Sequence, residues 1–246
     1  MSIIENKKRI GRFTSSQMAR LMANGRKKDQ PGAKFHTYVE EKALERKLNR
    51  SFDLGKGSTS TAWGDCLEQY LFEVRLKDDL SLSLQSKTTL SHPEFDFWAG
   101  SPDIIVEGAK VTEVKCYEPK KFCKYADVLM EQDVELLKST HPDEYWQIVS
   151  NACLLGVERG EAMLYMPYQK DLNTLREWIE MELESDDLFR FRFITEYDDY
   201  KLPYVPNEGS KYNDLIRFEF EVPEADKEAL TERVKLAEQE LQNQLK

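Results

Sequence analysis

The sequence contains no long hydrophobic run and few cysteines or histidines. Its apolar stretches are far shorter than the roughly 20 residues of a membrane-spanning helix, and its N-terminus lacks the apolar core of a signal peptide. The four cysteines form no C-x-x-C pair, which disfavours disulfides and zinc sites and suits a reducing compartment. The three histidines share no spacing typical of zinc ligands. We therefore expect a cytoplasmic protein with free thiols and no membrane association.

Several common catalytic signatures are also missing. The chain has no glycine-rich phosphate loop followed by Lys-Ser or Lys-Thr, no dinucleotide-binding fingerprint and no Ser, His and Asp in a hydrolase order. The first absence excludes an ATP-driven motor within this sequence. Cys116 and Cys123 lack partner cysteines at cluster spacing near the C-terminus, so we expect no iron–sulfur cluster.

The most informative stretch is residues 101–115, which has the pattern of a β-hairpin. Two short β-branched runs, Ile104–Val106 and Val111–Thr112, are joined at Glu107-Gly108, where the glycine permits a tight turn. Apolar residues surround the hairpin, including Trp98 before it. The charged residues of this stretch are therefore expected at the edge of a buried sheet.

Three of these charged residues are predicted to meet. A hairpin that returns from Asp103 places its carboxylate beside Glu113. Glu113 and Lys115 are two residues apart, so both point to the same face of the strand. Two carboxylates and an ammonium can hold a hard divalent cation and direct an attacking water. A surface salt bridge is the ordinary alternative, but the apolar surroundings favour a functional site.

This pattern, Pro102-Asp103 followed by Glu113-Val114-Lys115, resembles the PD-(D/E)xK nuclease signature. Further blocks are similar to the phage-type exonucleases of the lambda exonuclease (YqaJ) family and occur in the family's order. They are an R-x-G-x-x-T-x-S segment from Arg9 to Ser16, a W-G-x-x-x-E segment from Trp63 to Glu68, Gly100-Ser101-Pro102-Asp103, and Tyr145-Trp146-Gln147.

The sequence departs from the related patterns at two positions. Ile104 follows Ser-Pro-Asp where the family often has glycine, but Gly108 can set the hairpin geometry instead. Asn151 lies four residues after Gln147, where the related RecB-type nucleases carry a tyrosine. The second departure favours the phage exonuclease branch.

The resemblance implies a magnesium site, with Mn²⁺ as an alternative ion. Asp103, Glu113 and the carbonyl of Val114 would be its ligands, which suits a cation that prefers oxygen ligands and retains several waters. Lys115 would orient or help deprotonate the attacking water. These roles make Asp103, Glu113 and Lys115 the centre of the predicted catalytic site.

Other residues receive roles from the same resemblance. Glu68 would hold a second metal or a metal-bound water, and Gln147 would contact such a water or the scissile nucleotide. Arg9 and Ser16 would bind a terminal 5′-phosphate, with Arg12 as a further DNA-binding residue. The simpler alternatives are an ordinary helix glutamate for Glu68, a partly buried amide for Gln147 and a helix cap for Ser16.

The implied fold is an α/β, restriction-endonuclease-like core, with a central mixed sheet flanked by helices on both faces. We expect a single domain over residues 1–246, with its core at about 8–196 and an acidic C-terminal strand and helix at 197–246. The expected helices lie at about 14–25, 33–48, 61–75, 119–130, 144–155, 172–184 and 223–245, and the expected strands at 82–90, 95–99, 104–106, 111–116, 162–166 and 215–222. Thr14 or Ser15 is expected to cap the first helix.

The net charge of −10 is unevenly distributed along the chain. Residues 1–50 contain 13 Lys and Arg against 5 Asp and Glu, whereas the remainder contains 22 against 40. A basic N-terminal part beside an acidic bulk suits weak, salt-sensitive contact with a short stretch of DNA. For Arg26-Lys27-Lys28, a solvated basic face is an equally good interpretation.

The resemblance implies metal-dependent, 5′-to-3′ degradation of one strand of linear double-stranded DNA from a 5′-phosphate end. The products would be 5′-mononucleotides and a 3′ single-stranded tail for recombination through a single-strand annealing protein, in a bacterial or phage-infected cell. It also implies a ring-shaped homotrimer. Two alternatives stay open: another nuclease of this fold, such as an endonuclease or single-strand exonuclease, and a DNA-end-binding module without catalysis.

Overall fold

The computed structural model describes residues 8–27, 30–52, 57–78, 84–85, 88–106 and 108–246. The helices are η1 (Ser15–Gln17), α2 (Met18–Met22), α3 (Ala33–Leu48), α4 (Thr59–Tyr70), η2 (Leu71–Arg75), α5 (Pro119–Met130), α6 (Val134–Thr140), α7 (Pro142–Leu155), η3 (Gln169–Asp171), α8 (Leu172–Glu182), α9 (Ser185–Glu196), η4 (Asp199–Lys201) and α10 (Glu224–Leu245). The strands are β1 (Phe13–Thr14), β2 (Leu84–Gln85), β3 (Leu90–Ser91), β4 (Trp98–Gly100), β5 (Ile104–Val106), β6 (Lys110–Lys115), β7 (Arg159–Tyr165) and β8 (Leu215–Glu221). Across these ranges, none of the helices is both long and apolar enough to cross a membrane.

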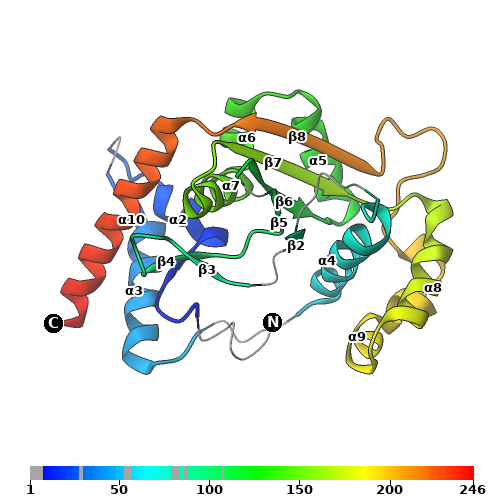
Figure 1. Ribbon diagram of the computed structural model, residues 1–246, viewed down its shortest axis with the longest axis horizontal. Helices are drawn as coiled ribbons and strands as arrows, with labels where there is room; N and C mark the ends of the chain where they lie inside the picture. The colour runs from blue at the N-terminus through cyan, green and yellow to red at the C-terminus, as the bar shows by residue number, and fades with distance from the viewer. Residues whose placement is uncertain (1–7, 28–29, 53–56, 79–83, 86–87, 107) are drawn as a thin grey trace.

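The main sheet has five strands in the order β2-β5-β6-β7-β8 (Figure 1). β6 and β7 are parallel and are connected by α5, α6 and α7, whereas the other neighbours in this sheet are antiparallel. This confirms the predicted mixed sheet. A separate three-stranded sheet, β1-β4-β3, was not predicted and joins the N-terminal segment to the strand before the hairpin.

Side chains from alternate positions of β6 and β7 enter two apolar cores. Val111 and Leu164 pack in one core with residues of α2, α3, α5, α7 and α10. Val114 and Met163 pack in the other core with residues of α4, α8 and α9. Since successive side chains of a strand point to opposite faces, these cores lie on opposite sides of the sheet. Helices therefore cover both faces, as the α/β expectation required.

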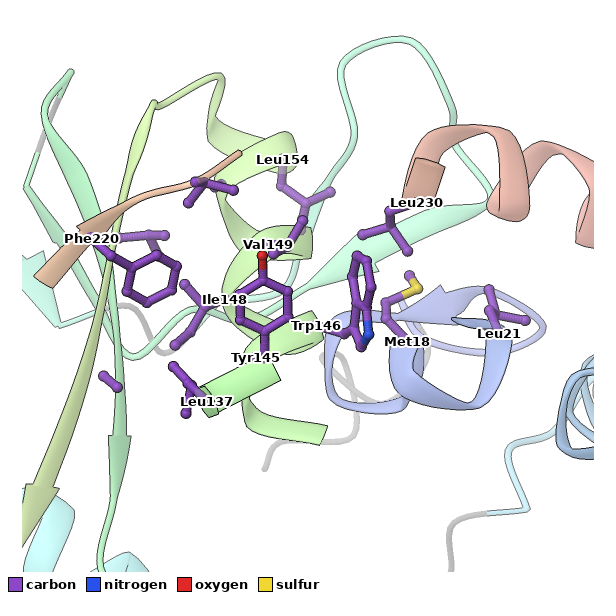
Figure 2. Close-up of a cluster of buried hydrophobic side chains, with 14 of the residues drawn as sticks. Met18, Leu21, Leu137, Tyr145, Trp146, Ile148, Val149, Leu154, Phe220 and Leu230 are labelled. Carbon is purple, nitrogen blue, oxygen red and sulfur yellow. The ribbon is translucent and has the colours of Figure 1, made fainter. Parts of the chain in front are cut away.

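α7 is the central helix of the larger core (Figure 2). The ring of Tyr145 stacks on Phe220 of β8 with 6.0 Å between ring centroids and meets Trp146 edge-on at 5.3 Å. Figure 2 shows Met18 of α2 and Leu230 of α10 on the far side of Trp146. Packing on both sides fixes the position of this helix, which carries Gln147 as the residue directly after Trp146.

Several sequence expectations need correction. The helix expected at 14–25 is divided into η1 and α2, and neither Thr14 nor Ser15 caps it: the Thr14 and Ser15 hydroxyls instead pair with Tyr38 and Ser150. The strand expected over 82–90 is represented in the described residues by the short β2 and β3. The helices α6 and α9 were not predicted, because α6 is a short helix that begins at an Asp133 cap and α9 follows α8 after only two residues.

Candidate active site

The hairpin predicted from the sequence is present. β5 and β6 are antiparallel, with Ile104 opposite Thr112 and Val106 opposite Lys110. Gly108 has a φ of +67°, the left-handed conformation that glycine adopts without steric cost, while Glu107 lies outside the described residues. The register places Asp103 next to Glu113, and the Asp103 carboxylate accepts a hydrogen bond of 2.7 Å from the backbone N–H of Val114. The predicted convergence of these residues is confirmed.

Glu113 and Lys115 point to the face of the sheet that α7 covers. Lys115 Nζ lies 2.6 Å from Glu113 Oε1, and the Glu113 side chain is only 3% exposed. From α7, Gln147 donates its Nε2 to the same Glu113 oxygen and accepts a 3.4 Å hydrogen bond from Lys115 at its Oε1. The expectation that Gln147 lies at the site is therefore met, and its amide bridges the two charged residues.

The two carboxylates strongly affect one another. Burial raises the pKa of Glu113 well above its ordinary value, and the Asp103 carboxylate raises it further. Burial also raises the pKa of Asp103, despite the charge of Lys115 and the hydrogen bond from Val114. For Lys115, burial acts to lower the pKa, but attraction by Glu113 and Asp103 outweighs this and raises the pKa above its usual range. Lys115 is thus an ammonium at neutral pH. Its single positive charge does not compensate both carboxylates, Asp103 and Glu113.

Glu68 approaches the same residues from the opposite face of the sheet. It lies in the last turns of α4 and lines a small cavity together with Asp103 and Val114. Its negative charge also contributes, after burial, to the raised pKa of the Cys116 thiol on the strand edge. α4 continues directly into the π-helix η2, a form often found next to functional sites. The structure therefore brings Glu68 to the Asp103 side of the predicted site.

The donor set fits a hard cation. Within the described ranges, no group of three His, Cys, Asp or Glu side chains is placed to hold a metal unaided. Asp103, Glu113 and the Val114 carbonyl would supply oxygen ligands, which Mg²⁺ supplements with water. A divalent cation would also stabilise the ionised forms of Asp103 and Glu113, whose pKa values are raised chiefly by burial.

The two predicted phosphate-binding residues lie on the N-terminal segment that precedes α2. Ser16 is exposed on η1, and η1 packs against α7 through the 2.8 Å contact of Ser15 with Ser150. Arg9 is partly buried in the turn that precedes β1. Both residues therefore lie in the segment that leads through β1 into η1, and η1 is the part of this segment that contacts α7.

Arg12 is engaged within the protein. Its guanidinium donates to the carbonyl of Lys8 at 3.0 Å, to the Ser91 hydroxyl at 2.7 Å and to the carbonyl of Asp96. These acceptors tie the turn containing Arg9 to the β3–β4 connection. Burial lowers the pKa of the guanidinium. These contacts favour a role for Arg12 in positioning Arg9, rather than a role in binding DNA directly.

Several basic side chains of the N-terminal part pair with acidic side chains of the same protein, which the sequence did not indicate. Arg46 forms an ion pair of 2.6 Å with Glu238 of α10, and Arg20 pairs with Glu41 at 2.7 Å. His36 contacts Glu240 of α10 at 2.8 Å. Acidic residues of the C-terminal helix thus compensate part of the basic charge. Arg26 and Lys27 remain on the exposed surface, and Lys28 lies outside the described residues.

One site residue was not identified from the sequence. Asn151 is completely buried and donates from its Nδ2 to Glu113 Oε2 at 3.1 Å. Its place four residues after Gln147 puts it on the same face of α7, and this spacing was the available signal. A single asparagine in a helix carries no chemistry by itself, so its contact with Glu113 is visible only in the structure.

Comparison with known proteins agrees with this geometry. The family model described as a YqaJ-like viral recombinase domain matches residues 6–154, a range that contains Arg9, Glu68, the hairpin and all of α7 except its last residue. No curated protein is similar enough to count as a relative.

The fold is shared with solved exonucleases. Two structures of the alkaline exonuclease LHK-Exo from Laribacter hongkongensis, one in complex with dAMP, are each 14% identical, with a TM-score of 0.66 over 99% of this chain and 94% of theirs. A phage-related exonuclease from Haemophilus somnus 129PT is 13% identical, with a TM-score of 0.61 over 95% of both chains. At this identity the likeness concerns the restriction-endonuclease-like fold. The family match spans more than half of the sequence, and the chain belongs to the YqaJ-like viral recombinase family.

Proposed function

We propose that this protein is a metal-dependent deoxyribonuclease that degrades one strand of linear double-stranded DNA from a 5′-phosphorylated end. The observation that carries the proposal is the buried convergence of Asp103, Glu113 and Lys115 at the end of the β5–β6 hairpin. Structural neighbours named as exonucleases support the nuclease class, and the neighbour bound to dAMP holds a 5′-mononucleotide, the class of product expected here.

The proposed mechanism follows from the charges of the site. A bound Mg²⁺ or Mn²⁺ would polarise the scissile phosphate and make a bound water more acidic. Asp103, Glu113 and the Val114 carbonyl would hold it, with Glu68 on the other side of the hairpin. Lys115, which lies 2.6 Å from Glu113, would orient the water and, as an ammonium, offset charge developing on the phosphate.

Arg9 and Ser16 are proposed to anchor the terminal 5′-phosphate. A guanidinium and a hydroxyl are suitable donors to phosphate oxygens. Arg12 holds the carbonyl of Lys8, the residue before Arg9, and would set the position of the anchoring arginine. Gln147, which bonds to both Glu113 and Lys115, would hold their side chains in place relative to the phosphate that Arg9 and Ser16 bind.

The family supports a role in recombination. The matching family is described as viral recombinases, so we propose that the 3′ tail left by digestion passes to a single-strand annealing protein in the cytoplasm of a bacterial or phage-infected cell. We also propose a homotrimer, on the family resemblance alone. We propose a single domain because α10 packs against α3 and thus joins the C-terminal region to the N-terminal one.

The test is digestion of linear duplex carrying a 5′-phosphate or a 5′-hydroxyl, with closed circular DNA alongside, in Mg²⁺ or EDTA. Release of 5′-mononucleotides from phosphorylated linear ends only, abolished by EDTA and by Asp103→Asn, supports the proposal. Cleavage of circles would assign an endonuclease instead. DNA-end binding without hydrolysis in Mg²⁺ and Mn²⁺ would leave a binding module and overturn the nuclease.

A further inference from the structure

The Glu113 carboxylate is held by different residues at its two oxygens. Lys115, the last residue of β6, and Gln147 of α7 both donate to Oε1. Asn151 donates to Oε2 from the core, one helical turn below Gln147. Because the two oxygens are held from different directions, the plane of the carboxylate is fixed before any ligand arrives.

We propose that Asn151 is a positioning residue that fixes Glu113 in the orientation required for metal binding. The inference rests on the proposed function, since it assigns Asn151 to the same site. It does not follow from the sequence pattern of related nucleases, because this chain has asparagine where RecB-type enzymes carry tyrosine.

The orientation of the Asn151 amide is determined by its surroundings. Its Oδ1 lies so close to Gly100 of β4 that a Cβ atom added to this glycine would be 2.6 Å from it. The same Cβ would be 2.1 Å from Ser15 Oγ and 2.5 Å from a methyl group of Leu154. A glycine at position 100 therefore provides the space in which the Asn151 amide fits.

This placement has an energetic cost. Asn151 Oδ1 is buried and accepts no hydrogen bond from the residues that the structure describes. A buried acceptor without a donor is destabilising, so such an arrangement needs a compensating role. Rotating the amide by half a turn would not relieve it, because Oδ1 would then oppose the Glu113 carboxylate. The NH₂ group is consequently directed at Glu113.

The helix around Asn151 is anchored independently. Ser150 Oγ lies 2.8 Å from Ser15 Oγ and accepts a 2.8 Å hydrogen bond from Trp98 Nε1. Ser150 is as deeply buried as Asn151, is adjacent to it and also bonds to neighbouring elements, but its contacts lead away from Glu113. It therefore offers a matched control for loss of a buried polar contact in α7.

The neutral amide suits this role. An aspartate of the same size would bring a third carboxylate beside Asp103 and Glu113, whereas a leucine would fill the volume without donating a hydrogen bond. Partners that orient metal ligands typically contribute about 10–100-fold to metal affinity. Loss of the Asn151 donor is expected to have an effect of this size.

The test measures Mn²⁺ binding to the DNA-free protein by calorimetry for wild type, Asn151→Leu, Asn151→Asp and Ser150→Ala, with Tm recorded for each. We expect about 10–100-fold weaker binding for Asn151→Leu and no restoration by Asn151→Asp. Ser150→Ala should lower Tm and retain wild-type affinity. With saturating Mn²⁺, Asn151→Leu should regain much of its nuclease kcat, since the reacting groups are intact.

Other results would overturn the inference. Wild-type Mn²⁺ affinity in Asn151→Leu would show that the contact is only structural, as would equal losses of affinity in Asn151→Leu and Ser150→Ala. If the leucine variant fails to fold, Asn151→Ser, which is too short to reach Glu113, provides the same comparison. Absence of Mn²⁺ binding by the wild type would instead contradict the proposed metal-dependent function itself.

Discussion

Two groups of charged residues in this protein differ in how their charge is used. At the hairpin, Asp103, Glu113 and Lys115 lie together; Glu113 is buried, Asp103 and Lys115 are partly buried, and the pKa values of all three are raised. α10 lies beside α3 (Figure 1), and basic residues of α3 such as Arg46, which is about as exposed as Lys115, pair with acidic residues of α10. In the first group two carboxylates share one ammonium, so negative charge remains uncompensated. In the second group the basic side chains are paired with acidic side chains of the same protein. Incomplete compensation around the buried Glu113 carboxylate, more than charge itself, therefore distinguishes the candidate site.

The largest effect should come from Lys115. Replacing it with alanine removes the ammonium that faces the proposed phosphate position, and we expect at least about a 100-fold loss of kcat. Single-turnover digestion of 5′-phosphorylated duplex measures this. Arg46→Ala is the matched charge removal at α3 and should retain activity close to wild type; equal losses in the two variants would erase the distinction between the groups.

A divalent cation should stabilise the folded protein by binding at the hairpin site and not at the charged residues around α3. A saturating divalent cation, at about 100 times its Kd, stabilises a folded protein by roughly 2.7 kcal/mol. Thermal unfolding of wild type with and without Mg²⁺ should show a clear rise in Tm, and Asp103→Asn should abolish it. Glu238→Gln, which alters an acid paired with Arg46, should preserve the rise. A Tm unaffected by Mg²⁺ and Mn²⁺ in the wild type would argue against a metal site.

Arg9 should give the enzyme a preference for 5′-phosphorylated DNA ends over 5′-hydroxyl ends. If its guanidinium holds the terminal phosphate, Arg9→Ala should lower kcat/KM on 5′-phosphorylated ends by about tenfold, as expected for loss of one charge-assisted contact. Activity on 5′-hydroxyl ends should change little. Arg26→Ala removes an exposed arginine from the same N-terminal region and should affect both ends equally. A uniform loss in Arg9→Ala would assign this residue to the fold.

Stability should depend on pH through the carboxylate pair. Because the folded state raises the pKa values of Glu113 and Asp103, it binds their protons more tightly than the unfolded chain. Their contribution is present below the ordinary carboxyl pKa of about 4.3 and is lost as pH rises through the raised values. Urea unfolding without metal should therefore show a stability decline over this window that is smaller in Glu113→Gln. Saturating Mg²⁺ should also reduce the decline, and a slope unchanged in both cases would contradict the pKa argument.

The smallest effect should come from the ion pair between α3 and α10. Arg46 donates to both carboxylate oxygens of Glu238 and also to the carbonyl of Gly11, and both side chains are partly buried. Glu238→Gln should lower the free energy of unfolding by about 1 kcal/mol, the upper end for such pairs. Arg192–Glu196, an exposed pair within α9, provides the control, and its removal should have a smaller effect. Urea denaturation resolves the two.

Much of the site was predictable because it is local. The spacing of Glu113 and Lys115 fixes their shared face by strand geometry, and the turn at Gly108 fixes the hairpin that returns Asp103 to Glu113. α3, α5 and β5 match their expected ranges in full, since their apolar patterns are clear. The expectations failed where local pattern is weak: α9 is exposed over much of its length, and Ser15 bonds to a residue of α7 rather than capping its own helix.

The sequence by itself determined the hairpin, its charged triad and the order of the family blocks, because these depend on residues close together in the chain. Only the tertiary structure decided which helix faces reach the triad. Glu68 and Gln147 arrive from opposite faces of the sheet, and Asn151 meets Glu113 because α7 packs against β6. Likewise, Arg12 donates to the Asp96 carbonyl and the Ser91 hydroxyl, both distant in the chain, and Arg46 pairs with Glu238 of α10. Such contacts depend on how separate elements pack, which no local periodicity encodes.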